Sequence, residues 1–406
     1  MMENNNTTYK DSPLGKIPCD WEVIKISDYG KVYTGNTPPT NDIENYGHEF
    51  LFVSPSDLGS DKYILNTEKK LSRKGFSVSR KFPAGSVLFT CIGSTIGKSG
   101  VASVELTSNQ QINTIVVDKK YSNEFLYYAL ESNSHKIKLL AGEQAVPILN
   151  KSQFESVRII CPPLPEQKAI ARILSLMDSA INTNNQLIAK KELQKKWLMQ
   201  QLLSVKLIVK NEKWCKSGVR KVTIGEIAKV NMGQSPDSDY YNETHEGLPL
   251  IQGNADLKNR LSIERIFTTH ITKTCDQGDI IMTVRAPVGT IGISTKKSCI
   301  GRGVCALKPI NVDPSYFYYL MLNYEETWKR LEQGSTFTAV NSTDIFHFSL
   351  FIINSIEEQS AIAQVLQAAD KEIQLLKTKT EKLREQKKGL MQQLLTGKKR
   401  LQIVNN

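Results

Sequence analysis

Residues 93–99, GSTIGKS, contain the glycine, lysine and serine with which a phosphate-binding loop holds a nucleotide. Such a loop needs four residues between its first glycine and the Gly-Lys pair, so that successive backbone N–H groups wrap around the phosphates. Only Ser, Thr and Ile intervene here, and the similar segment APVGTIG at residues 286–292 has no lysine. We therefore interpret both segments as glycine turns between strands, with Lys98 and Arg285 available to contact an anionic backbone.

No other catalytic signature stands out in the sequence. The TPP stretch at residues 37–39 differs from the Asn-Pro-Pro-aromatic loop of amino-methyltransferases, because Thr37 follows Asn36 and no aromatic residue closes the motif. No Gly-x-Gly-x-x-Gly follows a strand, so neither an S-adenosylmethionine nor a dinucleotide fold is indicated. A Gly-x-Ser-x-Gly nucleophile turn is also absent. We predict that this chain has no catalytic residue.

The cysteines and histidines do not indicate a metal site or a disulfide framework. The seven cysteines are scattered and never form a Cys-x-x-Cys pair, and the five histidines are isolated. We expect reduced thiols, packed mostly in cores, with no metal and no cofactor.

The charge balance favours a polyanionic partner. Fifty-two Lys and Arg residues exceed 41 Asp and Glu residues, which gives a formal net charge of +11. Such an excess is typical of nucleic-acid-binding proteins, although a generally basic protein has the same composition. The polar N-terminus lacks a secretory apolar region, and no apolar run is long enough to span a membrane. We expect a cytoplasmic protein.

The elements that carry these residues occur twice. KKWLMQQLL begins at Lys195 and KKGLMQQLL at Lys387, with a single difference between them. The match extends upstream, where EQKAIARIL from Glu166 corresponds to EQSAIAQVL from Glu358. Further upstream, ISDYGKVYTGNTP corresponds to IGEIAKVNMGQSP, and SDL to ADL, with more substitutions and insertions. The chain is therefore a duplication, in which a variable module precedes a well-matched segment twice.

The two well-matched segments are predicted to be long helices. Apolar residues recur in them at spacings of three, four and seven, from Ile170 to Leu202 and from Ile362 to Leu394. Pro165 suits a first helical turn, and Ser355 with Glu358 fits a capping box. Each apolar stripe must be buried, and the simplest partner is the other helix in an antiparallel coiled coil with a pseudo-two-fold axis. The alternative is that each helix packs on its own module.

The two variable modules mix short β-rich runs with turns and one aromatic helical stretch. We predict a mixed α/β (α+β) fold for each module. The aromatic stretches FLYYAL from Phe125 and YFYYLM from Tyr316 are at helical spacing and are assigned to the core, not to a base-stacking platform. The predicted division of the chain is a polar tail (1–12), a first module (13–161), a first helix (162–210), a second module (211–353), a second helix (354–400) and a tail (401–406).

Several stretches resemble the specificity subunit of type I restriction–modification enzymes. They are SPLGKIPCDWEVIKISD from Ser12, the GNTP and GQSP turns, PPLPEQKAIARIL from Pro162 with its EEQSAIAQVL counterpart, and the repeated KKxLMQQLL. The resemblance covers almost the whole chain, from about residue 12 to 400. One departure is that the second copy has NSIE where the first has PPLP.

The resemblance implies that the modules are target recognition domains. Each would read one half of a split, asymmetric double-stranded DNA sequence through the major groove. The helices would be spacers that fix the gap and dock two modification (methyltransferase) subunits, which bind S-adenosylmethionine and methylate adenine. Restriction subunits would add ATP-driven translocation and cleavage. This chain would be the non-catalytic reader. Lengthening a helix by one turn should then change the gap between half-sites and not the half-sites themselves.

Base edges and phosphates are contacted by the same polar side chains on exposed loops, so the candidates are polar residues in the module loops. In the first module the candidates for DNA contact are Thr37, Ser56, Lys74, Arg80, Lys98, Asn109, Gln110 and Gln111. In the second module they are Ser235, Asn254, Lys258, Arg260, Arg285 and Arg302. On the helices, residues expected to be exposed and to contact the partner are Gln167, Gln200, Gln201, Gln359, Gln392 and Gln393.

Two other classes of function stay open at this point. A fused nuclease or other enzyme would need a cluster of carboxylates and a bound metal. A scaffold whose paired modules bind proteins would show no DNA binding, whereas phosphate contacts weaken measurably with salt.

Overall fold

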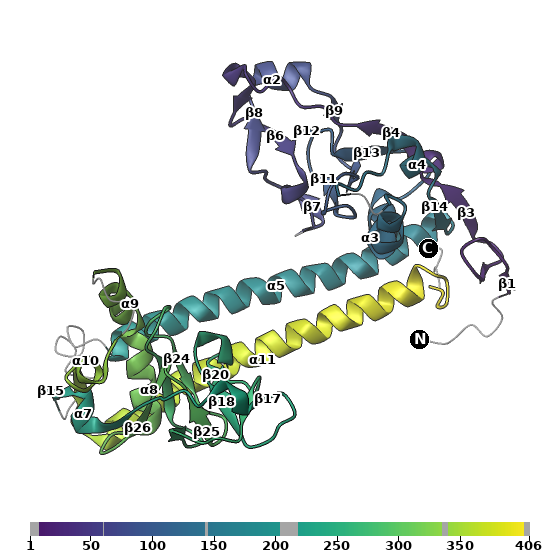
Figure 1. The fold of residues 1–406 in the computed structure, drawn as a ribbon. Coiled ribbons are helices and arrows are strands. Elements are labelled where there is room, and N and C mark those ends of the chain that lie inside the picture. The colour runs from purple at the N-terminus through teal and green to yellow at the C-terminus, as the bar shows by residue number, and fades with distance from the viewer. Residues whose placement is uncertain (1–7, 60, 143–144, 204–217, 335–339, 402–406) are drawn as a thin grey trace. The chain divides into compact units, whose positions relative to one another are not determined.

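The computed structural model describes residues 8–59, 61–142, 145–203, 218–334 and 340–401 of the chain (Figure 1). The chain divides into two compact units: Met1–Asn185 with Thr378–Asn406, called unit 1, and Gln186–Lys377, called unit 2. Each unit contains one module and parts of two long helices, α5 (Leu164–Leu203) and α11 (Ile356–Leu394).

The module of unit 1, purple to blue in Figure 1, is built on two five-stranded sheets. Its strands are β1 (Tyr9–Lys10), β2 (Ile17–Pro18), β3 (Glu22–Lys25), β4 (Gly30–Thr34), β5 (Tyr46–Gly47), β6 (Phe50–Val53), β7 (Tyr63–Ile64), β8 (Lys69–Leu71), β9 (Lys81–Phe82), β10 (Val87–Thr90), β11 (Ser99–Ala102), β12 (Leu106–Ser108), β13 (Ile112–Val117) and β14 (Arg158–Cys161). Its helices are α1 (Ile26–Tyr29), α2 (Arg73–Val78), α3 (Asn123–Leu139) and α4 (Lys151–Ser156). The strand orders are β4-β13-β10-β11-β7 and β5-β8-β6-β12-β9, with the smaller pairs β1-β2 and β14-β3.

The module of unit 2, green in Figure 1, has a similar plan. Its strands are β15 (Val219–Thr223), β16 (Ala228–Met232), β17 (Tyr241–Asn242), β18 (Leu248–Ile251), β19 (Leu257–Lys258), β20 (Leu261–Ser262), β21 (Phe267–Thr268), β22 (Thr274–Cys275), β23 (Ile280–Thr283), β24 (Ile291–Ile293), β25 (Ser298–Ile300), β26 (Val304–Pro309) and β27 (Ser349–Ile353). Its helices are α7 (Ile224–Ile227), α8 (Pro314–Asn323), α9 (Glu325–Gly334) and α10 (Ser342–Phe346). The strand orders are β16-β26-β23-β24-β20-β19, β17-β21-β18-β25-β22 and β15-β27.

The internal repeat predicted from the sequence is therefore confirmed at the level of topology. The central strands β10 (VLFT) and β23 (IIMT) are buried along their whole length, as expected of apolar strands covered on both faces. The helices α3 and α8 begin at equivalent caps, because Ser122 accepts a hydrogen bond from the Phe125 amide and Asp313 accepts one from the Tyr316 amide. Phe125, Tyr128 and Tyr316 are buried, so the assignment of the aromatic stretches to the core is correct.

The long helices run antiparallel within each unit. In unit 2, Lys191 pairs with Glu372 at 2.8 Å and Glu192 pairs with Lys377 at 2.7 Å. In unit 1, Asp178 pairs with Lys387 at 2.8 Å. All apolar stripe residues of the described helices are buried or half-buried, from Ile170 to Leu202 and from Ile362 to Leu394.

The helix ends also pack on the modules. The start of α5, at Ile170 and Leu174, shares a core with module 1 and with Leu394 at the end of α11. The end of α5, at Leu202, shares a core with module 2 and with Leu366 near the start of α11. The two packing alternatives raised by the sequence are therefore both realised, along different parts of the same helices.

The repeated segment KKxLMQQLL contributes an equivalent contact to each unit. In unit 1, Lys387 lies 5.3 Å from the centroid of the Tyr128 ring, and Tyr128 donates a 2.6 Å hydrogen bond to Asp178. In unit 2, Lys195 lies 5.4 Å from the ring of Tyr319, and Tyr319 donates a 2.7 Å bond to Asp370. Lys195 pairs with that same Asp370. We call each set a Lys-Tyr-Asp triad; it joins the two helices to the aromatic helix of the module.

The remaining broad predictions concern helix bounds, thiols and membranes. The helices are shorter than predicted by a few residues, since α5 begins after Pro163 and the chain turns at Gly397 (φ +71°) after α11; residues 204–210 lie outside the described part. Of the six cysteines in the described part, Cys19 is exposed and the others are buried, and burial raises the pKa of Cys305 to about 12. No described helix is both long and apolar enough to cross a membrane.

Candidate nucleic-acid interface

Three turns meet at equivalent places in the two modules. In unit 1 they contain Thr37, the short 3-10 helix around Ser56, and residues 109–111; we call them loop cluster 1. In unit 2 they contain Ser235, the 3-10 helix around Asn254, and residues 301–303; we call them loop cluster 2.

The same backbone contacts hold both clusters together. In unit 1 the backbone N–H of Gly35 donates a 3.0 Å hydrogen bond to the carbonyl of Ile112. In unit 2 the backbone N–H of Gly233 donates a 3.0 Å bond to the carbonyl of Val304. A Cβ atom on Gly35 would collide with the carbonyl oxygen of Asn109, and one on Gly233 with that of Gly301. The glycines of the GNTP and GQSP turns are thus required by close approach of two backbones.

The aspartates of the SDL and ADL motifs shape the second turn of each cluster. The Asp57 carboxylate accepts a 2.8 Å hydrogen bond from the backbone N–H of Ser54, and the Asp256 carboxylate accepts a 2.8 Å bond from the backbone N–H of Gln252. Asp256 also accepts a 3.1 Å bond from the Arg265 guanidinium. These carboxylates are engaged within the fold and fix the turns that present the neighbouring polar side chains.

Loop cluster 2 encloses a polar cavity of about 450 Å³. Four of the six residues predicted for the second module line it: Ser235, Asn254, Arg285 and Arg302. Gln252 and Tyr241 also line it, joined by a 2.6 Å hydrogen bond. Neither residue was predicted from the sequence, although Gln252 precedes the ADL motif by only a few residues. The cavity can therefore accept a ligand rich in hydrogen-bond acceptors.

Loop cluster 1 brings together five of the eight residues predicted for the first module. Thr37 donates a side-chain hydrogen bond to Gln110. The side-chain NH₂ group of Asn109 donates a 3.0 Å hydrogen bond to the side-chain oxygen of Gln111. Ser56 is exposed and lies 2.8 Å from the hydroxyl of Ser54. The exposed polar atoms of this cluster are hydroxyls and amides.

Three predicted residues of the first module lie outside these turns or are engaged elsewhere. Lys74, on α2, pairs with Asp42 at 2.9 Å and with Glu44 at 2.7 Å. The Arg80 guanidinium donates to the carbonyl of Thr34. Lys98 lies 3.5 Å from the carbonyl of Pro55, next to the cluster. DNA contact by these three residues stays a prediction.

The two other predicted residues of the second module differ from each other. Lys258 is exposed on β19. Arg260 forms a two-pronged ion pair with Glu325, a carboxylate that is 7% exposed, and also donates to the carbonyl of Ile291 at 3.1 Å. Arg260 therefore links β24 to the start of α9 within the module. The sequence does not reveal this contact, because Glu325 is far from Arg260 along the chain.

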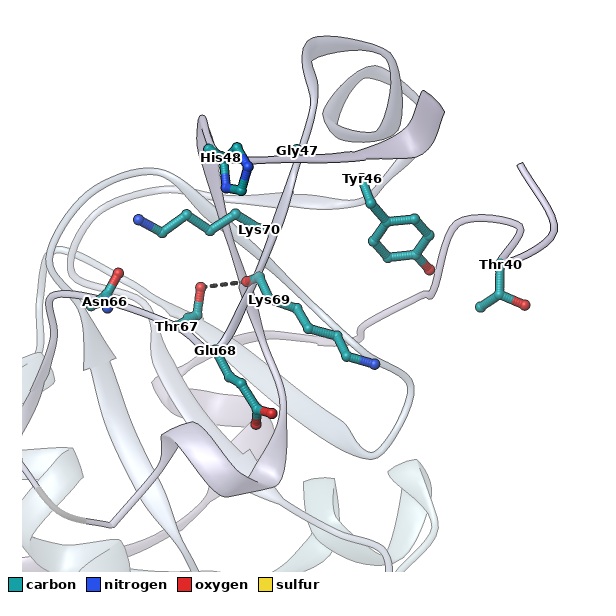
Figure 2. Close-up of a pocket in the computed structure, with 9 residues that line it drawn as sticks. All are labelled: Thr40, Tyr46, Gly47, His48, Asn66, Thr67, Glu68, Lys69 and Lys70. Carbon is teal, nitrogen blue, oxygen red and sulfur yellow. Dashed lines mark hydrogen bonds between the residues drawn. The ribbon is translucent and has the colours of Figure 1, made fainter. Parts of the chain in front are cut away.

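A second pocket, of about 630 Å³, lies beside β5 and β8 in unit 1 and was not predicted. Figure 2 shows Lys69 extending on the side of Tyr46 and Thr40, and Lys70 extending the opposite way, past His48. The adjacent lysines in β8 were a sequence signal for a basic site. Because successive residues of a strand point to opposite faces, they place positive charge on both sides of β8. Glu68 also lines the pocket, and the two lysines outweigh its single negative charge, so the pocket suits an anionic ligand.

The prediction that Gln167 and Gln359 are exposed is wrong. Each is 1% exposed and joins the start of a long helix to the aromatic helix of its module. Gln167 accepts a 2.9 Å bond from the Ser122 amide and donates a 2.8 Å bond to Pro162. Gln359 likewise accepts from the Asp313 amide and donates to Ile353, at 2.8 and 2.7 Å. A glutamine early in a helix is usually exposed, but here each side-chain amide bonds a buried backbone N–H and a buried backbone carbonyl.

Replacing Gln167 by alanine is expected to destabilise unit 1 by about 1–3 kcal/mol, because it leaves a buried amide and a carbonyl without partners. Urea denaturation of the purified chain would measure the loss. Gln392→Ala, at an exposed glutamine of α11 in the same unit, is the matched control. Equal midpoints for the two variants would contradict this role of Gln167.

The other predicted partner residues remain accessible. Gln200, Gln392 and Gln393 are exposed and Gln201 is half-buried. Their contact with a partner stays a prediction. Across the described residues, no group of three or more His, Cys, Asp and Glu side chains could hold a metal ion.

Comparison with known proteins identifies the fold. A family model described as the type I restriction modification DNA specificity domain matches residues 18–193 and 216–385. The putative MjaX specificity subunit of Methanocaldococcus jannaschii is 30% identical, over 97% of this chain and 97% of that protein. The MjaVIII specificity subunit of the same organism is 25% identical, over 96% and 95%.

Solved structures agree. The chain resembles a structure from a study of complex assembly and conformational transition of the type I R-M system, with 22% identity, coverage of 94% of this chain and 99% of that one, and a TM-score of 0.63. It also resembles the type I S subunit from M. genitalium, with 17% identity, coverage of 97% and 98%, and a TM-score of 0.62. These similarities concern the fold alone. The family model matches both modules, and a 30% identical relative spans nearly all of the chain. The chain therefore belongs to the type I restriction–modification specificity subunits, the family that recognises the DNA target.

Proposed function

We propose that this chain reads a bipartite DNA sequence as the non-catalytic specificity subunit of a type I restriction–modification complex. Each module would read one half-site, and α5 and α11 would set the gap and dock two modification subunits. The observation that carries the proposal is the recurrence of one loop cluster in both modules, held by equivalent contacts but lined by different polar side chains. Two loop clusters with the same backbone contacts but different polar side chains suit recognition of two half-sites that differ in sequence.

The excess of basic residues supports DNA as the ligand, since the net charge is +11. The lysines beside β5 and β8 would contact phosphates, which position the protein without reading sequence. A scaffold that binds only proteins is not favoured, because the family model that matches both modules is one of DNA specificity.

The first test is reconstitution with a modification subunit. The purified chain alone should transfer no methyl groups, whereas the complex should methylate adenine in a bipartite sequence. DNA binding by the complex should weaken steeply as salt increases, because phosphate contacts release counterions. Methyl transfer by the chain alone, or DNA binding independent of salt, would contradict the proposal.

The second test lengthens the helices. Inserting seven residues into both α5 and α11, at positions that face each other, keeps the apolar stripe in phase and adds roughly 10 Å of helix. The gap between the half-sites should grow by about 3 bp, at roughly 3.4 Å per base pair. Methylome sequencing reads the gap directly, and a fourteen-residue insertion should double the change. Altered half-site sequences would contradict a spacer role.

A further inference from the structure

The two loop clusters differ at two equivalent positions. The backbone N–H of Cys91 donates a 2.8 Å hydrogen bond to the backbone carbonyl of Gln111, and that of Val284 donates a 2.9 Å bond to the carbonyl of Gly303. This shared contact aligns the turns that follow β10 and β23, so Ile92 corresponds to Arg285. The turns before β13 and β26 align through their strand pairing, so Gln110 corresponds to Arg302. Arg302 in loop cluster 2 and Arg285 in the turn beside it therefore stand where the first module has Gln110 and Ile92.

Arg285 and Arg302, which both line the cavity of loop cluster 2, are accessible to a ligand. They are exposed, they line the same cavity, and neither guanidinium has a hydrogen-bond or ion-pair partner among the residues that the structure describes. Among the described residues, no acidic side chain lines this cavity. Arg260 differs, because Glu325 pairs with its guanidinium. The turn that carries Arg302 is fixed by a 3.1 Å bond from its own amide to Ser235. Exposed guanidiniums without a carboxylate partner suit a ligand that offers paired acceptors.

Loop cluster 1 offers different chemistry at the same place. Gln110 is exposed, and its carbonyl oxygen accepts the hydroxyl of Thr37, which orients its NH₂ group. Asn109 and Gln111 flank it and bond each other at 3.0 and 3.1 Å. In the turns that form this cluster, no arginine or lysine occupies the equivalents of Arg285 and Arg302.

Resting on the proposed function, we propose that the two modules differ in the base pair they read at this place: Arg285 and Arg302 select a guanine in the half-site of module 2, and Gln110 selects an adenine in the half-site of module 1. A guanidinium matches the two major-groove acceptors of guanine, O6 and N7, whereas an amide matches the donor and acceptor of adenine, N6 and N7. The same guanidiniums also suit a phosphate. A base is favoured over a phosphate because the arginines share their cavity with Gln252, Asn254 and Ser235, which offer the mixed donors and acceptors that base edges require.

The experiment uses the chain together with its modification subunit, and methylome sequencing as the readout. Arg302→Lys and Arg285→Lys keep the charge but lose the two-pronged geometry, so they should relax one guanine position of one half-site by about tenfold or more. The other half-site should be unchanged. Gln110→Ala should relax an A·T position in that other half-site. Lys229→Ala, at an exposed lysine of β16, is the control and should leave both half-sites unchanged.

A measurement on the DNA guards against misfolded variants. Replacing the selected guanine by 7-deazaguanine removes N7, and it should weaken binding of the unaltered complex by roughly fivefold or more. The inference is overturned if the lysine variants lower methylation at all sites without changing the motif, as loss of a phosphate contact would, or if the position they relax is not a G·C pair. In both cases the bipartite motif of the unaltered complex remains and the proposed function stands. An unaltered complex with no bipartite motif would refute both.

Discussion

Replacing Arg400 by alanine should destabilise unit 1 by about 3 kcal/mol, because it leaves a buried carboxylate without its cation. Glu166 is 1% exposed and accepts 2.8 Å hydrogen bonds from both Nε and Nη2 of Arg400. Its other side-chain donor is the indole N–H of the fully buried Trp21, at 2.9 Å. The backbone N–H of Leu401 also donates to Glu166, at 3.4 Å, but two neutral donors cannot replace the charge of the guanidinium. This contact joins the C-terminal segment after α11 to the N-terminal segment and to the start of α5.

The loss should be local as well as large. Hydrogen exchange should show faster exchange in residues around Trp21 and at the start of α5, and urea denaturation should show an earlier transition of unit 1. Lys399→Ala, at the exposed neighbour of Arg400, should change neither measurement. If the two variants lose equal stability, the buried carboxylate does not depend on Arg400.

The same variant should change the response to acid. Arg400 also binds Asp20, through two hydrogen bonds of 2.8 and 2.7 Å, and this holds the pKa of Asp20 below its usual value. A lowered carboxyl pKa adds stability above the unfolded-state value, near 4, and that stability is lost as the pH falls through the folded-state value. Because Asp20 is about half exposed (52%), the contribution is small. In Arg400→Ala this part of the acid sensitivity should disappear.

The repeat, the helices and the cores were predictable because they depend on periodic patterns. Apolar spacing identifies which face of a helix is buried, whatever the partner, and the duplicated segments identify equivalent elements. Periodicity does not identify the neighbour of a polar side chain. Gln167 is a surface residue by type, yet the first turn of α5 meets the amide of Ser122, far away in the sequence. Arg260 and Arg302 are alike in the sequence, but only Arg260 has Glu325 beside it.

The loop residues were partly predictable because the turns are marked by Gly-x-x-Pro and Asp-Leu motifs. Those motifs place Thr37, Ser235 and Asn254 on turns, and the structure brings the turns together. They do not indicate that Ile92 and Arg285 are equivalent, because the intervening segments differ in length and a backbone contact is needed to align them. The lysines of β8 were missed for a related reason: a strand of three residues is too short to show alternation.

Replacing Lys387 by alanine should cost unit 1 about 2 kcal/mol, whereas Lys388→Ala should cost almost nothing. Lys387 is 14% exposed, pairs with Asp178 at 2.8 Å and with Glu131 at 3.3 Å, and lies over the Tyr128 ring. Without it, the carboxylates of Asp178 and Glu131 lose the cation that they share. Lys388 is exposed, so Lys388→Ala removes the same charge without removing a buried contact. Comparison of the two variants therefore isolates the effect of the buried contact.

The pH dependence of this variant distinguishes an electrostatic contact from simple packing. Burial raises the pKa of Glu131, and the nearby Lys387 lowers it, so removing Lys387 should raise that pKa further. A group with a raised folded-state pKa binds more protons when folded, so stability falls as the pH rises through that value. The cost of Lys387→Ala, measured by urea denaturation, should therefore be largest at neutral pH and shrink toward pH 4–5. A cost independent of pH would indicate lost packing instead.

Unit 2 provides the comparison within the same molecule. Lys195 and Asp370 repeat the triad, but Leu322 stands at the position equivalent to Glu131, so the second carboxylate is missing. Asp370 is also more exposed than Asp178, at 42% against 23%. Lys195→Ala should therefore destabilise unit 2 by about 1 kcal/mol, with a weaker dependence on pH. The two triads share one repeated segment, and the difference in their expected cost follows from the missing carboxylate and from the greater exposure of Asp370.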